Sequence, residues 1–168
     1  MKTGIILIFH NYEKHINKEV FITHANQFDN IMLCLVNNDS KDNTYNVLKE
    51  IKTACDNVSV VNIKKFKSDA AAVRAGARFL NSTCKLDHIG YVNTNILSLK
   101  ANTLEMVLKL IKQKQYAIIE YRVKLLSAKS IKQTLFKKLF PILDCITKIE
   151  LENQHSDSFH NPKKIIVK

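Results

Sequence analysis

Short apolar runs alternate along this chain with segments of helical periodicity, and this alternation limits the fold more than any other feature. Continuous apolar runs at 4–9 and 30–36 are typical of strands that are buried on both faces. Three further strands are predicted, at 57–63, 88–92 and 116–121. Helices are predicted between the strands, at 13–27, 43–54, 68–81 and 101–114. Parallel strands joined by helical crossovers satisfy this order, so we expect one α/β domain with a Rossmann-like, mostly parallel sheet flanked by helices.

Polar residues follow three of the predicted strands. His10 follows the first strand, Asn37 and Asn38 follow the second, and Asn93 and Asn95 follow the fourth. The carboxyl ends of parallel strands meet at one edge of a sheet, and ligands of open α/β sheets bind outside that edge. We therefore expect the loops that leave the second and fourth strands to share a ligand cleft.

Four stretches of the chain resemble the family 2 glycosyltransferases, which bind nucleotide sugars in a GT-A fold. They are IILIFHNYEKHI (5–16), VNNDSKDNTYNVLKEI (36–51), NVSVVNIKKFKSDAAAVRAGARFL (57–80) and HIGYVNTNILSL (88–99). In that family an acid after the second strand contacts the base. An Asp-X-Asp motif after the fourth strand holds the ribose and a divalent metal bound to the diphosphate. The resemblance spans roughly residues 3–100. It implies transfer of a sugar from a nucleotide diphosphate sugar to an acceptor, such as a lipid or a polysaccharide.

Asparagine occupies the acidic positions of that family. Asn37 and Asn38 stand where an acid pair is usual, and Asn93-Thr94-Asn95 stands at the Asp-X-Asp position. A neutral amide can hydrogen-bond a base edge, but it holds Mg²⁺ or Mn²⁺ much more weakly than a carboxylate does. We therefore expect a nucleotide site whose metal position, at Asn95, is degenerate, and metal-dependent activity that is weak or absent.

The resemblance also implies roles for single residues. The residues expected to hold the nucleotide are His10, Tyr12, Asn38, Lys67 and Asn93. Lys67, with Lys64 and Lys65 close to it, is expected to neutralise the diphosphate. By similarity to dolichyl-phosphate mannose synthases, Arg122 is expected to meet an acceptor phosphate, and Asp144 is a distant match to an aspartate of those enzymes. The sequence singles out no residue as the catalytic base.

Three functional interpretations remain open. The chain is a glycosyltransferase that works without a tightly held metal, a relative that kept the fold and lost transfer activity, or a binding scaffold of the same fold. The resemblance weakens after residue 122, so the acceptor side is expected to be truncated. A truncated acceptor side favours the last two interpretations, because neither of them needs an acceptor site.

Positive charge is concentrated in the second half of the chain. The formal net charge is +11, and residues 109–148 hold ten basic and two acidic side chains. Such an excess attracts phosphate groups of nucleotides, nucleic acids or anionic lipids. Nucleic-acid binding is not expected, because the sequence has no zinc-site, RNP-like or helix-turn-helix signature. Residues 129–149 predict a basic amphipathic helix that lies on an anionic membrane surface, packs on the sheet or binds a partner.

The chain is expected to divide into three segments. A nucleotide-sugar-binding-like domain spans 1–124, the basic helix spans 125–150, and a polar tail spans 151–168, in which residues 164–168 could add an edge strand. No apolar run approaches the length of a membrane span, and the four cysteines show no metal-type pairing. We expect a cytoplasmic protein, peripheral at most to the inner face of the membrane.

Overall fold

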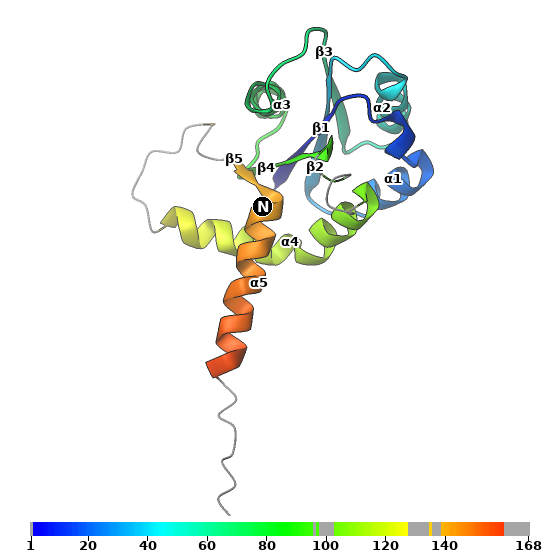
Figure 1. Cartoon of the computed structure of the whole chain (residues 1–168). Coiled ribbons are helices and arrows are strands. Elements are labelled where there is room, and N and C mark those ends of the chain that lie inside the picture. Colours follow the sequence, from blue (N-terminus) through cyan, green and yellow to red (C-terminus); the bar gives the residue numbers. More distant parts are fainter. Residues whose placement is uncertain (1, 96, 98–102, 128–134, 136–138, 160–168) are drawn as a thin grey trace, which may run out of the picture.

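The computed structural model describes residues 2–95, 97, 103–127, 135 and 139–159, which form a five-stranded α/β sheet (Figure 1). The strands are β1 (Thr3–Phe9), β2 (Ile31–Asn38), β3 (Val58–Ile63), β4 (His88–Asn93) and β5 (Leu139–Pro141). They are ordered β3-β2-β1-β4-β5, and every neighbouring pair is parallel. The predicted α/β fold with a parallel sheet is confirmed, and the carboxyl ends of β1, β2 and β4 lie side by side.

Helices cover both faces of the sheet. They are the 3-10 turn η1 (Glu13–His15) and the helices α1 (Lys18–Ala25), α2 (Thr44–Ala54), α3 (Asp69–Thr83), α4 (Leu104–Ser127) and α5 (Ile142–Phe159). The helix α3 packs on one face, and α1, α2, α4 and α5 pack on the other. Figure 1 shows this division, with α3 on its own side of the sheet.

The two-sided cover explains the apolar runs of the central strands. Along β1, Ile5 and Leu7 join the core under α1, α2 and α4, whereas Ile6 and Ile8 join the core under α3. Successive side chains of a strand point to opposite faces, so a strand buried on both faces needs an unbroken apolar sequence. Gly76 brings α3 close to the sheet, since a Cβ atom there would lie 2.9 Å from a side-chain carbon of Ile6.

The strand predicted at 116–121 is wrong, because these residues belong to α4. The helix runs from Leu104 to Ser127, and Ile118 continues the buried stripe of Leu108 and Ile111. Neighbouring Ile118 and Ile119 favour a strand locally. Their place on a helix with a buried face overrides that preference, because β propensity depends strongly on what a segment packs against.

The basic helix predicted at 129–149 is also wrong in part. Residues 128–134 and 136–138 of this segment lie outside the described residues. Residues Leu139–Pro141 form the edge strand β5, and the helix α5 begins only at Ile142. Pro141 fits this edge strand because proline lacks the N–H that a central strand would need. On α5, Ile142, Cys145, Ile146 and Ile149 are buried in the core, so the apolar face of this helix packs inward.

The polar tail predicted from residue 151 begins as helix. The helix α5 continues to Phe159, and the edge strand expected at 164–168 lies outside the described residues. Within the part of the chain that the structure describes, no helix has the length and apolar character needed to cross a membrane.

Candidate functional site

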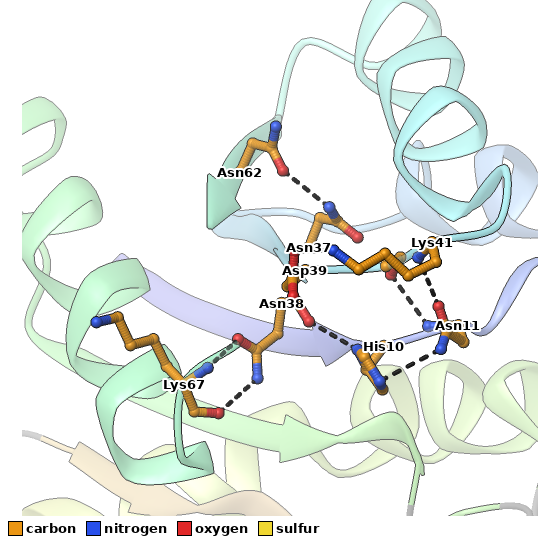
Figure 2. Close-up of polar contacts among 9 residues, drawn as sticks. His10, Asn11, Asn37, Asn38, Asp39, Lys41, Asn62 and Lys67 are labelled. Atoms are coloured by element: carbon orange, nitrogen blue, oxygen red, sulfur yellow. Dashed lines mark hydrogen bonds and ion pairs between the residues drawn. The ribbon is translucent and has the colours of Figure 1, made fainter. Parts of the chain in front are cut away.

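His10 connects the carboxyl ends of three adjacent strands. It follows β1, and its ring Nδ1 lies 2.7 Å from the backbone oxygen of Asn38 at the end of β2. Its backbone N–H donates to Asn95 Oδ1 at 3.3 Å, and Asn95 Nδ2 donates back to the His10 carbonyl at 3.1 Å. Asn38 and Asn95 therefore lie on two sides of one residue, at the same edge of the sheet. Figure 2 shows the His10 contact with Asn38.

The contacts of His10 define the position of its ring proton. A carbonyl oxygen only accepts hydrogen bonds, so Nδ1 carries the proton. The other ring nitrogen, Nε2, lies 3.3 Å from Nδ2 of Asn11, which is a donor. The orientation of the Asn11 amide follows from its oxygen, which accepts from the Lys41 N–H at 2.7 Å. In this arrangement both ring nitrogens have a hydrogen-bonding partner. The ring also meets Phe66 edge-on, with 4.9 Å between centroids.

Asn38 ties the loop before α3 to the sheet. Its side chain is 1% exposed, its Nδ2 donates to the Lys67 carbonyl at 2.8 Å, and its Oδ1 accepts from the Lys67 N–H at 3.0 Å (Figure 2). The neighbouring Asn37 points to the other face of the sheet and donates to Asn62 Oδ1 at 2.8 Å. The amide of Asn38 thus holds a backbone loop through both of its ends.

Two loops at this edge are joined by hydrogen bonds. The loop after β1 and the loop after β2 share five of them: Asn11 N–H to Ser40 Oγ (3.0 Å), Lys41 N–H to Asn11 Oδ1 (2.7 Å), Tyr12 N–H to Thr44 Oγ1 (2.8 Å), Glu13 N–H to Asp42 Oδ2 (3.1 Å) and Asn43 N–H to Glu13 Oε2 (3.1 Å). Asn11 and Asp39 adopt φ angles of 50° and 58°, in the left-handed region that asparagine and aspartate tolerate better than most residues. The polar turn formers of these loops therefore build a fixed rim.

The two aspartates of this rim, Asp39 and Asp42, bind neighbouring groups of the rim itself. The Lys41 ammonium, 2.7 Å away, lowers the pKa of Asp39 below its ordinary value against an opposing effect of burial. Burial raises the pKa of Asp42, but hydrogen bonds from the Thr44 hydroxyl, the Thr44 N–H and the Glu13 N–H outweigh it, and the net shift is downward. Both carboxylates act here as hydrogen-bond acceptors for the loops.

Replacing Asn11 by alanine is expected to lower the free energy of unfolding by about 2–3 kcal/mol. The variant loses two side-chain hydrogen bonds, each worth about 1 kcal/mol, and alanine tolerates the positive φ less well than asparagine, which costs up to about 1 kcal/mol more. Asn11→Gly loses the same bonds without the backbone cost, so it should be about 1 kcal/mol more stable than the alanine variant. Urea denaturation of the three proteins measures both differences, and equal stability of the alanine and glycine variants would contradict the backbone contribution.

The side chains of Tyr12 and Arg122 lie outside the hydrogen-bond network around His10. Tyr12 is 4% exposed and packs edge-on against Phe9, and burial raises its pKa. Arg122 lies on α4 and not after a strand. Its guanidinium stacks 4.6 Å from the Phe140 ring centroid, and burial lowers its pKa. Arg122 does not line the cleft described next.

A cleft of about 740 Å³ opens beside the network, between α3 and the segment that holds β5 and the start of α5. Its polar lining includes Asp69, Arg74, Asn93 and Asp144, and Tyr91 and Leu143 belong to the rest of the wall. Asn93 Nδ2 donates to Asp69 Oδ2 at 2.6 Å, which links the end of β4 to the first turn of α3. Asp69 and Arg74 were not predicted as site residues. The sequence signal was present, because Asp69, Ala70, Val73 and Arg74 have the spacing of one helix face.

The donor groups at the position where the resemblance implies a metal do not fit a divalent cation. Asn93 Oδ1 accepts from the Asn95 N–H at 3.0 Å, and both ends of the Asn95 amide are bonded to the His10 backbone. Among the residues that the structure describes, no three His, Cys, Asp or Glu side chains are grouped as a metal centre requires. Two neutral amides already engaged with N–H and C=O groups are poor ligands for Mg²⁺ or Mn²⁺.

Comparison with known proteins yields matches among solved structures only. No protein-family model matches the chain, and no curated protein matches it. A structure of TarS from S. aureus has a TM-score of 0.45 and 16% identity, over 55% of this chain and 16% of TarS. TarS 1–349 in complex with UDP gives a TM-score of 0.44 and 15% identity, over 68% of this chain and 33% of that one. The complex with UDP-GlcNAc gives 0.42 and 15%, over 68% and 32%. The chain spans about a third or less of the length of these structures.

Proposed function

We propose that this domain binds a nucleoside diphosphate sugar at the carboxyl edge of its sheet and transfers the sugar to an acceptor, such as a lipid or a polysaccharide. The observation that carries the proposal is the position of His10, which joins the ends of β2 and β4 next to a cleft of about 740 Å³. A cleft of this volume is of the size that small-molecule sites have. The sequence resemblance to family 2 glycosyltransferases supplies the class of ligand.

The base is proposed to stack on Phe66, beside His10. Phe66 is 55% exposed although its ring rests on His10, and both backbone groups of the next residue, Lys67, are held by Asn38. An exposed ring on a fixed loop offers a flat surface to a nucleobase. Tyr12 and Asn38 are then positioning residues, since one is buried in the core and the other is bonded to the loop. Lys67 follows Phe66 on this loop, and its side chain is exposed.

The sugar and its acceptor are proposed to occupy the cleft. In the transfer, the acceptor oxygen forms a bond to the anomeric carbon. The bond from that carbon to the diphosphate oxygen breaks, and the diphosphate departs with the electron pair. The proton of the acceptor hydroxyl must pass to a base. Asp144 supplies a carboxylate within the cleft, opposite the α3 wall that holds Arg74, and we assign it this role.

Isothermal titration with UDP, GDP and dTDP tests nucleotide binding. At least one of the three is expected to bind and to raise the thermal midpoint. At a hundredfold excess over Kd, binding stabilises the folded state by about 2.7 kcal/mol. No binding and no thermal shift with any of the three would refute the proposed function.

Phe66→Ala is expected to weaken binding of the preferred nucleotide by about tenfold or more, because stacking of a base on an aromatic side chain contributes about 1–3 kcal/mol. Tyr116→Ala is the matched control, since Tyr116 is 76% exposed on α4 and lies outside the site. It should leave affinity unchanged. Equal affinities of the two variants would place the base elsewhere.

The engaged amides of Asn93 and Asn95 favour a second candidate function. A relative of the same fold that binds nucleotide sugars without transferring them needs no metal and no base, and it would act as a scaffold. Tight nucleotide binding with no turnover of any UDP- or GDP-sugar supports this candidate over the transferase.

A further inference from the structure

The diphosphate that leaves in the proposed transfer needs a positive charge close to it. A departing nucleoside diphosphate accumulates negative charge, and in the resembled family a divalent metal neutralises it. Here Asn93 and Asn95 stand at the metal position, and each amide is already engaged with neighbouring protein groups. Another cation at the cleft must therefore supply the charge. The inference below rests on the proposed function.

Lys67, which the resemblance led us to expect beside the diphosphate, does not line the cleft, whereas Arg74 does. Arg74 lies on α3 one turn after Ala70, and it lines the same cleft as Asn93 and Asp69. The Asp69 carboxylate is engaged with Asn93 at 2.6 Å, and the described residues include no ion pair to Arg74. Arg74 is exposed, so its guanidinium remains available to a ligand.

We propose that Arg74 binds the diphosphate of the nucleotide in place of a divalent metal. A guanidinium donates two parallel N–H bonds to two phosphate oxygens and keeps its positive charge at any physiological pH. During transfer it gives up no proton. It stabilises the diphosphate while the bond between the anomeric carbon and the phosphate oxygen breaks. Asn93 lies on the same cleft wall and fixes the first turn of α3 through Asp69.

Binding of inorganic pyrophosphate, UDP and uridine in the presence of EDTA tests this assignment. Arg74→Ala is expected to weaken pyrophosphate and UDP binding by about 10- to 100-fold, as for loss of a charge-assisted pair, and to leave uridine affinity within about twofold. Arg74→Lys should recover part of the loss, because lysine keeps the charge without the bidentate fork. Arg78→Ala removes the same charge one turn further along α3, outside the cleft, and should bind all three probes like the wild type.

Two results would overturn the assignment of Arg74. One is wild-type affinity of Arg74→Ala for pyrophosphate and UDP. The other is loss of wild-type binding to both phosphates when EDTA is added, which would mean that a metal holds them. Failure of the nucleotide proposal would give a different result. The wild type would then bind pyrophosphate in an Arg74-dependent way, but it would not bind uridine, and its affinity for UDP would be no higher than its affinity for pyrophosphate. Thermal unfolding of all variants shows whether each is folded.

Discussion

Replacing Asp144 by asparagine is expected to abolish most of the sugar transfer while leaving nucleotide affinity unchanged. A general base in the transition state contributes about 10²- to 10⁴-fold to a rate, and an amide cannot take the acceptor proton. Asp144 lies on the first turn of α5 and reaches the cleft from the side opposite α3. Hydrolysis of a UDP-hexose, followed as UDP release, measures the rate, and calorimetry with UDP measures affinity.

Glu150→Gln provides the control for Asp144. Glu150 lies on the same helix, pairs with Lys114 at 3.5 Å and is absent from the cleft wall. Its loss should leave both the rate and the affinity within about twofold, since exposed ion pairs contribute little. A wild-type rate in Asp144→Asn would remove Asp144 from the reaction. A parallel fall of rate and UDP affinity would make it a nucleotide ligand.

Asn38→Asp is expected to lower the free energy of unfolding by about 3 kcal/mol or more. The side chain is 1% exposed, and its Nδ2 faces the Lys67 carbonyl at 2.8 Å. An ionised carboxylate there meets a carbonyl oxygen without a proton between them, and a buried charge without a partner is costly. Chemical denaturation at pH 7 measures the loss.

The pH dependence of Asn38→Asp gives a second readout. Burial raises the pKa of a carboxyl group in the folded state above its unfolded value, so the penalty is largest at high pH. Lowering the pH should recover stability relative to the wild type, because the protonated acid donates to the Lys67 carbonyl. Asn62→Asp is the control, since Asn62 is exposed at the same sheet edge and accepts from Asn37. A difference between the two variants that stays constant from pH 7 to pH 4 would contradict a buried charge at residue 38.

The central sheet could be predicted from the sequence because its signals are local. Strands buried on both faces must be apolar throughout, and the runs that became β1 and β2 show this directly. The prediction failed after residue 115, where β-branched residues in an amphipathic helix imitate a strand. The edge strand β5 is only three residues long, and its partner β4 decides its structure. A segment this short carries too little periodicity to be recognised alone.

The candidate site, like the sheet, could be predicted from the sequence only in part. The polar residues after β1, β2 and β4 were expected at one edge, and His10 indeed contacts both Asn38 and Asn95. The sequence could not show that the amide of Asn38 is engaged with the Lys67 backbone. Nor could it show that Arg74 and Asp144, 70 positions apart in the chain, line one cleft.

The order of the apolar and amphipathic segments, by itself, determined a parallel α/β sheet with polar loops at its carboxyl edge. Burial and crossover geometry leave few other arrangements for such an order. Only the tertiary structure decided which of those polar groups are engaged within the protein and which face the cleft. That choice depends on distances between residues far apart in the sequence, and hydrogen bonds form only when donor and acceptor come within about 3 Å of each other.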